Sequence, residues 1–528
     1  MQLETAPGHS SGGRSVWATI QRAVTARRGA FALALIVLSS LAFRVQMSHE
    51  CSFSLDEAST HQDAMKPWAA VLKGPSKEHP PLSYVLAKCS IVLFGESETA
   101  MRAFTLFFGC VLLVVIYQLC LELRLTVGRS LVTTATFALS PFLIKSGTDA
   151  RQYAIYGSFI TLALISSLRL LRGPLRIRDL IGFAAGAALA AWTHYFALAY
   201  ALALLGALLI GIAPSWKRTR VSKRLVAVVL LIGLLAVFWL VAVRIAALVD
   251  YYSHGKHAPA AGPLFNTDLL FDFFQDFGFM SYKVWSFAIQ PLLALVGLVL
   301  LTLRLRGIAR SLPLGLGLAP CLAALFLSSG HFVAARYLAP SAVLYHLAVC
   351  VALFAALDRV RRVPRVLAGG ARRLLVPLAG WLVLAVLVIA RLCELPNGFG
   401  TGTDYYQGLQ SYFVENLSKD TRVVAYFGDF GWILFAREYR LGSPPIYLEK
   451  FRRVRGIDRY LVIEIDVFGD RRPAFESLIE QKFGLSAQEW RALPLVPLPR
   501  SRYQPSVPAH FVQLPSDNSP APERRRRR

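Results

Sequence analysis

Two adjacent carboxylates, Asp56 and Glu57, follow the first strongly apolar segment of the chain, Phe31 to Val45. Glu78-His79-Pro80-Pro81 completes the same polar stretch. Carboxylates are costly to place at the mouth of a membrane helix, which favours a functional reason for them. A carboxylate there can act as a general base on a hydroxyl or an amine. Alone, the Asp-Glu pair is more typical of a solvated loop, and the rest of the chain reverses that interpretation.

The composition is that of a polytopic membrane protein. The chain has 528 residues, of which 55% are hydrophobic and 17% charged, and its mean hydropathy is +0.48. Apolar stretches of about 17 to 25 residues recur, the length that a helix needs to cross a bilayer. The net charge of +25 comes mostly from Lys and Arg in short loops between these stretches, so it reflects topology and no nucleic-acid partner is expected.

The basic loops predict the topology. Residues 1–28 form a basic cytoplasmic N-terminus, residues 29–391 a transmembrane module, and residues 48–98 a long first outer loop. Leu82 to Phe94 is short and headed by prolines, so we expect an interfacial or re-entrant helix there rather than a span. About eleven spans result, at residues 30–47, 100–121, 129–147, 152–171, 179–195, 196–213, 224–247, 284–303, 312–329, 337–357 and 374–391.

This topology collects polar and aromatic side chains at helix ends on the outer face. Ionisable groups that converge there predict a site. Each has a plainer alternative: His194 as a buried, hydrogen-bonded histidine, for example, or Arg336 as an interface anchor. Besides the two carboxylates, the candidates are Lys77, His79, Tyr84, Asp149, Arg151, Tyr153, His194, Arg336 and Tyr337.

Carboxylates beside cations at a membrane surface suit the transfer of a group from a lipid phosphate. The carboxylate would serve as the base, and Arg, Lys and His would bind the phosphate that leaves. The sequence contains no Gly-rich phosphate loop, no Ser-His-Asp order and no zinc motif, so nucleotide hydrolysis, serine hydrolysis and zinc-protease chemistry find no support.

Six short motifs in order resemble the membrane glycosyltransferases of the GT-C superfamily, most closely the protein O-mannosyltransferase and aminoarabinose-transferase group (families 39 and 83). They are Leu55-Asp56-Glu57, His79 to Tyr84, Gly95 to Arg102, Ser140 to Tyr153, Thr193 to Phe196 and Arg336 to Pro340. The resemblance implies a polyprenyl-phosphate-sugar donor and transfer outside the cytoplasmic membrane with inversion at the anomeric carbon.

The resemblance also implies roles for single residues. Asp56 matches the acidic residue of the first loop, the general base, and Glu57 its neighbour in the pocket. His79 sits near the donor, and Arg336 with Tyr337 near the lipid phosphate. Asp149-Ala150-Arg151 positions the acceptor or the sugar, and because it copies no single subfamily's pattern, the division of roles between Asp149 and Arg151 stays open.

After residue 391 the composition becomes more polar. Residues 392–500 are expected to form an α/β domain on the periplasmic side, with strands at 422–427 and 459–465 and helices at 432–439 and 472–483. Residues 501–528, rich in Pro and Ser and ending in five arginines, are expected to be a disordered basic tail.

The sequence therefore predicts an inner-membrane enzyme that takes a sugar from a polyprenyl phosphate and gives it to a periplasmic lipid, glycan or protein. Two alternatives remain: a ligase or polymerase with lipid-pyrophosphate donors, and a transporter or flippase. A transporter would need ionisable groups near the bilayer midplane and two related halves. No cofactor is required, although the carboxylates leave a divalent cation open. Cys51 and Cys89 leave an outer disulfide open.

Overall fold

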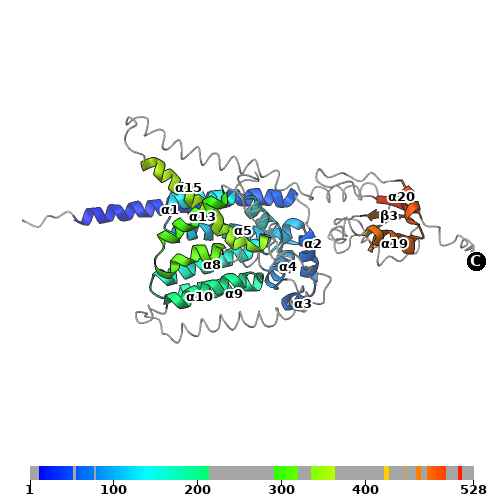
Figure 1. Ribbon diagram of the computed structural model, residues 1–528, viewed down its shortest axis with the longest axis horizontal. Coiled ribbons are helices and arrows are strands. Elements are labelled where there is room, and N and C mark those ends of the chain that lie inside the picture. Colours follow the sequence, from blue (N-terminus) through cyan, green and yellow to red (C-terminus); the bar gives the residue numbers. More distant parts are fainter. Residues whose placement is uncertain are drawn as a thin grey trace, which may run out of the picture. The chain divides into compact units, whose positions relative to one another are not determined.

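A computed structural model gives the fold, and it describes residues 11–50, 55–75, 79–212, 290–318, 335–362, 421–426, 446–447, 459–464, 472–494 and 509–513. The chain divides into two compact units. One comprises Met1–Ser48 with Lys66–Pro396, and the other comprises His49–Met65 with Asn397–Arg528. Each unit is described by itself below, with the element labels of Figure 1.

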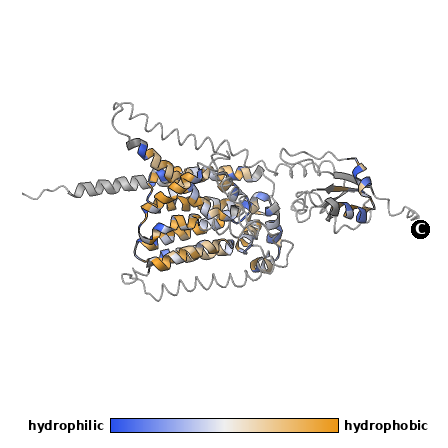
Figure 2. Cartoon of the chain, viewed as in Figure 1, coloured by the Kyte–Doolittle hydropathy of each residue, from blue (hydrophilic) through white to orange (hydrophobic). Residues whose placement is uncertain are grey.

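The first unit is a bundle of helices. In chain order they are α1 (Ser11–Glu50), α3 (Trp68–Lys73), α4 (Leu82–Phe94), α5 (Glu98–Glu122), α6 (Val127–Ala138), α7 (Pro141–Thr148), α8 (Tyr153–Arg172), α9 (Ile177–Thr193), α10 (Ala197–Ile212), α13 (Gln290–Arg304), the short 3₁₀ helices η3 (Gly307–Arg310) and η4 (Ala335–Leu338), and α15 (Ala339–Arg362). Residues 311–318 are also helical. Figure 2 shows how apolar these helices are, as a membrane-embedded bundle requires.

Four described helices are long and apolar enough to cross a membrane: Arg27–Ser48 within α1, α5, α8 and Ala339–Arg359 within α15. The α6–α7 pair, taken together, makes a fifth. The expected spans at 179–195, 196–213 and 284–303 correspond to the shorter helices α9, α10 and α13. The expected spans at 224–247 and 374–391 lie outside the described residues, so the count of about eleven stays a prediction.

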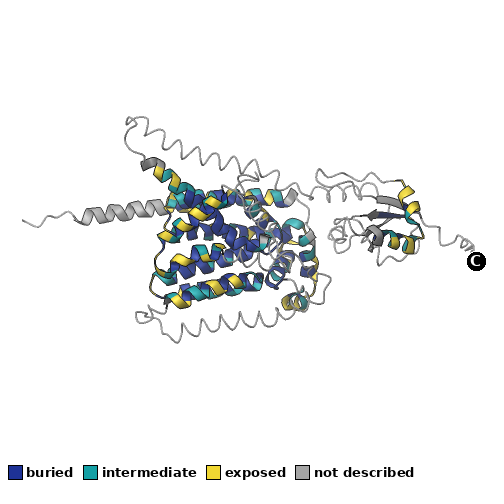
Figure 3. Cartoon of the chain, viewed as in Figure 1, coloured by how far each residue is buried: buried dark blue, intermediate teal, exposed yellow. Residues whose placement is uncertain are grey.

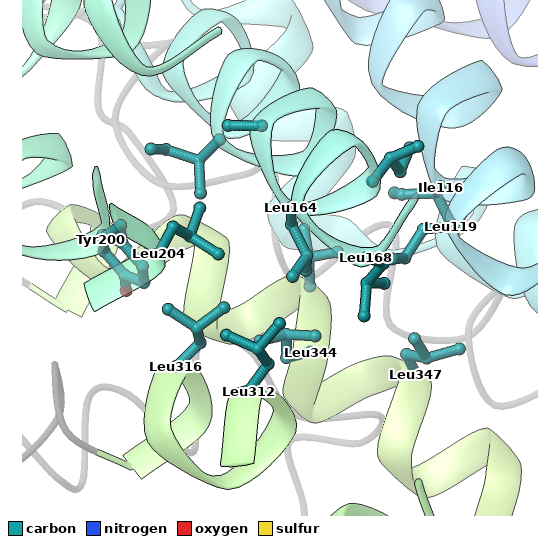
Figure 4. Close-up of a cluster of buried hydrophobic side chains, with 14 of the residues drawn as sticks. Ile116, Leu119, Leu164, Leu168, Tyr200, Leu204, Leu312, Leu316, Leu344 and Leu347 are labelled. Atoms are coloured by element: carbon teal, nitrogen blue, oxygen red, sulfur yellow. The ribbon is translucent and has the colours of Figure 1, made fainter. Parts of the chain in front are cut away.

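The core of the bundle is a cluster of leucines with a few aromatic rings. Figure 4 shows the part of it where side chains from α5, α8, α10, residues 311–318 and α15 meet. In Figure 3 the buried residues gather inside the bundle and the exposed ones follow its outer helix faces. Van der Waals packing of this kind holds helices together where the surrounding lipid is as apolar as the side chains.

Two glycines let neighbouring helices approach closely. A Cβ atom at Gly297 of α13 would lie 1.8 Å from the carbonyl oxygen of Ala348 in α15. A Cβ atom at Gly186 of α9 would lie 2.8 Å from the carbonyl oxygen of Phe159 in α8. Small residues at such crossings are typical of helix packing in membranes, and here they fix α13 against α15 and α9 against α8.

The expected span at 129–147 is broken in the structure. Thr126 caps α6, which ends at Ala138, and α7 begins at Pro141 after a bend of 65°. Proline has no N–H group and clashes with the preceding turn, so it is favoured at the first position of a new helix and disfavoured inside a continuous one. The expected span is therefore two helices with a bend between them.

The second unit contains α2 (Leu55–Met65) and a four-stranded sheet of order β2-β1-β3-β4. The strands are β1 (Thr421–Tyr426), β2 (Ile446–Tyr447), β3 (Arg459–Glu464) and β4 (Ala509–Gln513). β1 pairs in parallel with both β2 and β3, and β4 pairs antiparallel with β3. Buried residues of β3, β4 and the helices α19 (Arg472–Phe483) and α20 (Ala487–Ala492) form its core, namely Tyr460, Val462, Phe475, Ile479, Trp490 and Val512.

The expected strands at 422–427 and 459–465 and the expected helix at 472–483 match β1, β3 and α19. The expected helix at 432–439 lies outside the described residues. β4 lies within residues 501–528, for which the sequence predicts disorder. Its five-residue pairing with β3, from Ala509 opposite Ile463 to Gln513 opposite Arg459, corrects that expectation for 509–513.

Candidate functional site

The site in the first unit is built at helix junctions. His79 precedes the Pro80-Pro81 start of α4, Arg151 lies between α7 and α8, and His194 lies between α9 and α10. Tyr337 belongs to η4, directly before α15. Both histidines and Arg151 are buried. The contacts described next bring these four residues together from separate helix junctions.

Arg151 and His79 form a direct hydrogen bond. The NH2 nitrogen of Arg151 lies 3.0 Å from Nε2 of His79. A guanidinium can only donate, so Nε2 of His79 must accept. His79 is therefore neutral in this arrangement, with its proton on Nδ1, and Arg151 keeps its positive charge.

His194 sits within a group of aromatic rings. Its ring stacks on Tyr156 with centroids 4.9 Å apart, and the ring of Tyr337 lies 5.0 Å away at 54°. His79 lies 5.8 Å away. The backbone N–H of Phe196 donates to Nδ1 of His194 at 3.2 Å, so Nδ1 carries no proton and the neutral ring carries it on Nε2.

His194 owes its position to the break between two helices. α9 ends at Thr193, and the extended backbone of His194 separates it from α10, which begins at Ala197. The hydrogen bond from the N–H of Phe196 satisfies one of the donors left free at the start of α10. The histidine is thus both a structural cap and part of the site.

Tyr156 connects the rings to α15. Its hydroxyl donates to the carbonyl oxygen of Tyr337 and accepts from the N–H of Ala339 at 3.0 Å. The side chain of Tyr156 is fully buried in α8. These two hydrogen bonds across the bundle fix the start of α15, and with it the ring of Tyr337, against α8.

The predicted carboxylates divide between the two units. Asp56 and Glu57 occupy the first turn of α2, where the helix dipole favours negative charge, and Glu57 is buried. α2 belongs to the second unit, whereas the Arg151–His79 pair belongs to the first. Asp149 follows the last residue of α7, and its carbonyl oxygen accepts from the N–H of Arg151 at 2.6 Å.

The other predicted residues divide into three groups. Tyr153 joins the site, since its ring stacks on Tyr337 with centroids 6.3 Å apart. Tyr84 is buried in α4. Lys77 lies outside the described residues, and Arg336 is described only by its backbone in η4.

Cys89 is a free thiol, and Cys51 lies outside the described residues. Among the described side chains, no three His, Cys, Asp or Glu residues gather as a metal site.

Four residues were not among the candidates predicted from the sequence, although Arg102 and Phe196 end two of the resembling motifs. Tyr156 and Phe196 complete the aromatic group; both neighbour predicted residues, and helical spacing from Tyr153 is the signal that could have found Tyr156. Arg102 of α5 donates to the carbonyl oxygen of Ser48 at 2.7 Å, which neutralises the C-terminal end of α1. Arg44 is buried within the span of α1, so not every ionisable group lies at a helix mouth as expected.

One family model and several solved structures resemble this chain. A family model described as dolichyl-phosphate-mannose-protein mannosyltransferase matches residues 78–241. Crystal structures of ArnT from Cupriavidus metallidurans, one bound to undecaprenyl phosphate and one in the apo state, each align with a TM-score of 0.54 at 13% identity, covering 91% of this chain and 97% of that chain. The oligosaccharyltransferase AglB from Archaeoglobus fulgidus aligns with a TM-score of 0.45 at 12% identity, over 91% of this chain and 76% of its own. A search of curated proteins gives no significant match.

These comparisons confirm the resemblance to the GT-C membrane glycosyltransferases that the order of motifs indicates. The chain is a multi-pass membrane protein with the GT-C fold. The matched range 78–241 includes His79, Arg151 and His194, so the family match and the buried site coincide in the sequence.

Proposed function

We propose that the protein is a glycosyltransferase that moves a sugar from a polyprenyl-phosphate donor to an acceptor on the periplasmic face of the inner membrane. The observation that carries this proposal is the buried Arg151–His79 pair beside His194 and the tyrosine rings. The match to a dolichyl-phosphate-mannose-protein mannosyltransferase model and the likeness to an ArnT structure with bound undecaprenyl phosphate agree with it.

Arg151 is suited to the donor phosphate. It is buried at the start of α8, and the neutral His79 orients its guanidinium without cancelling its charge. A guanidinium pairs with phosphate oxygens through two parallel hydrogen bonds. In a site of low dielectric such a cation stabilises charge that develops on the leaving phosphate. Lys77 and Arg336 would add positive charge from the neighbouring segments.

The aromatic group is suited to the sugar. Tyr153 and Tyr337 stack on each other, and Tyr156 stacks on His194. Rings of this kind offer apolar faces together with polar hydroxyl or imidazole edges, which fits the mixed surface of a sugar ring. The group lies beside the Arg151–His79 pair, which supports the proposal that it binds the sugar of a donor whose phosphate contacts that pair.

The reaction needs a base, and Asp56 in the first turn of α2 is the proposed one. Its carboxylate would take the proton of the acceptor hydroxyl or amine while the acceptor atom bonds to the anomeric carbon. The bond from that carbon to the phosphate oxygen breaks, and the oxygen leaves with the electron pair. Glu57 would shape the pocket and Asp149 would position the acceptor. Attack opposite the leaving group inverts the anomeric carbon.

The test is sugar transfer by the purified protein in detergent, with a panel of radiolabelled polyprenyl-phosphate sugars and a membrane and cell-wall extract as the acceptor. The proposal expects transfer by the wild type and none by Asp56→Asn, with folding and lipid binding kept. Equal activity of the two proteins would remove Asp56 from the mechanism and move the base to Asp149. Substrate movement across liposomes without turnover of any donor would contradict the transferase function.

A further inference from the structure

A stripe of polar side chains runs along one face of α1 inside its membrane span. Ser40, Arg44 and Ser48 are four residues apart, so they lie one above another on the helix. All three are buried, and Arg44 is only 1% exposed. Only 11% of the most apolar window of this span is buried, so the protein covers this polar stripe while it leaves most of the helix uncovered.

The polar atoms of this stripe lack partners within the part of the chain that the structure describes. Neither hydroxyl oxygen of the two serines, nor Nε and NH1 of Arg44, forms a hydrogen bond there. The titratable neighbour of the guanidinium is the Cys110 thiol of α5, and no described carboxylate pairs with Arg44. Buried polar groups are nearly always hydrogen-bonded, and an uncompensated charge inside a membrane is especially costly.

The guanidinium occupies a slot between two other helices. A Cβ atom at Gly109 of α5 would lie 2.0 Å from NH1 of Arg44, and one at Gly147 of α7 would lie 2.6 Å from it. Both positions are glycine, so the backbones of α5 and α7 leave room for the charged group. Arg44 therefore points into the bundle, whereas an arginine that only anchors a helix end extends toward the membrane surface.

We propose that Arg44, together with the hydroxyl of Ser40 or of Ser48, forms a binding site for a phosphate-type oxyanion inside the helical bundle. Arginine stays protonated in proteins, so the positive charge persists and requires an anion. Its planar fork matches two oxygens of a phosphate, and the hydroxyl of either Ser40 or Ser48, each about 6 Å from Arg44 along the helix, can donate to a third. The site is separate from Arg151 and does not depend on the proposed transferase activity.

The test measures thermal unfolding of the full-length protein in detergent, in the Arg151→Gln background so that the other phosphate site does not contribute. Inorganic phosphate, undecaprenyl phosphate and undecaprenol, which has no phosphate, are added in separate arms. We expect phosphate or the lipid phosphate to raise the unfolding temperature, undecaprenol to have no such effect, and Arg44→Met to weaken anion binding at least tenfold. A response to inorganic phosphate alone would identify a free anion, and a response confined to the lipid would identify a headgroup.

A second pair of variants keeps the charge. Gly109→Ala should displace the guanidinium and weaken anion binding, whereas Gly206→Ala, with nothing within 4 Å of the added atom, should leave it unchanged. Without any anion, the Arg151→Gln protein that also carries Arg44→Met should be at least as stable as Arg151→Gln alone, because Arg44→Met removes an unpaired charge. A less stable Arg44→Met would show that Arg44 pairs within the protein, and equal stabilisation of both proteins by phosphate would place the anion elsewhere; either result would overturn the proposal.

Discussion

Arg151 donates a hydrogen bond to Nε2 of His79 across 3.0 Å, although the two residues are 72 positions apart in the chain. The bond joins the start of α4 to the α7–α8 junction and makes His79 a neutral acceptor. Whatever binds Arg151 therefore meets a guanidinium group whose direction is set by a second loop.

The first prediction concerns the acceptor in that pair. His79→Leu removes Nε2 and weakens the hold on a buried guanidinium, at a cost of about 1–3 kcal/mol in the free energy of unfolding. Donor affinity should fall as well, because Arg151 loses its orientation. Thermal unfolding in detergent and the KM for the donor measure the two effects. His79→Gln, which keeps a carbonyl acceptor, is the matched control and should retain more of both; equal losses in the two variants would contradict the role of the hydrogen bond.

The second prediction concerns the hydroxyl of Tyr156, which bonds both Tyr337 and Ala339. Tyr156→Phe should lower the free energy of unfolding by about 1–3 kcal/mol, because it leaves backbone groups without this partner in a buried place. Transfer should fall too, since the ring of Tyr337 is no longer held. Tyr117→Phe is the control, since the Tyr117 hydroxyl has no recorded hydrogen bond among the described residues. An unchanged unfolding temperature for Tyr156→Phe would show that the bridge is unimportant.

The third prediction tests the close crossing of α13 and α15. Gly297→Ala places a methyl group against the backbone of Ala348, so one helix must shift. We expect a loss of roughly 1–3 kcal/mol or more, typical of overpacking, in the free energy of unfolding. In Gly206→Ala the added methyl group has open space, and alanine favours a helix more than glycine does. The free energy of unfolding of this control should therefore not fall. Equal unfolding temperatures for the two variants would contradict the close approach of α13 and α15 at Gly297.

The fourth prediction is a pH dependence in the second unit. Ser486 and Glu489 form a capping box at the start of α20, and the hydrogen bonds from the backbone and side chain of Ser486 lower the pKa of the Glu489 carboxyl below its usual value of 4.5. A lowered pKa stabilises the folded state above the unfolded value and loses that effect as the pH falls through the folded value. Amide protection in α20, measured by hydrogen exchange, should therefore decrease below pH 4.5. Glu489→Gln should show a flat profile; a decrease of the same size there would contradict this origin.

Much of the site could be predicted from helix junctions in the sequence. His79 is marked by two prolines, His194 by the polar break in a long apolar stretch, and Arg151 by its place before a span. Each marks a chain reversal at a membrane surface, where polar side chains are tolerated. Local sequence alone therefore brings these residues to helix ends, and the shared surface brings them together.

Other features depend on contacts that local sequence does not encode. In the sequence Tyr156 is an ordinary aromatic residue of an apolar helix. Only its hydrogen bonds to η4 and α15 show that it joins α8 to the start of α15. Arg44 can be buried only because two glycines on different helices, Gly109 and Gly147, leave room for its guanidinium. β4 follows a Pro-rich stretch that predicts disorder, and it becomes a strand because the edge of β3 supplies its hydrogen bonds.

The most direct test of the central claim is the affinity of the purified protein for a radiolabelled polyprenyl-phosphate sugar, compared among wild type, Arg151→Gln and Asp56→Asn. If the Arg151–His79 pair holds the donor phosphate, Arg151→Gln should bind the donor at least about tenfold more weakly, as expected for the loss of a charge-assisted contact. Asp56→Asn should bind it like the wild type and fail to transfer the sugar. Wild-type affinity in folded Arg151→Gln would contradict the claim that this pair is the donor site.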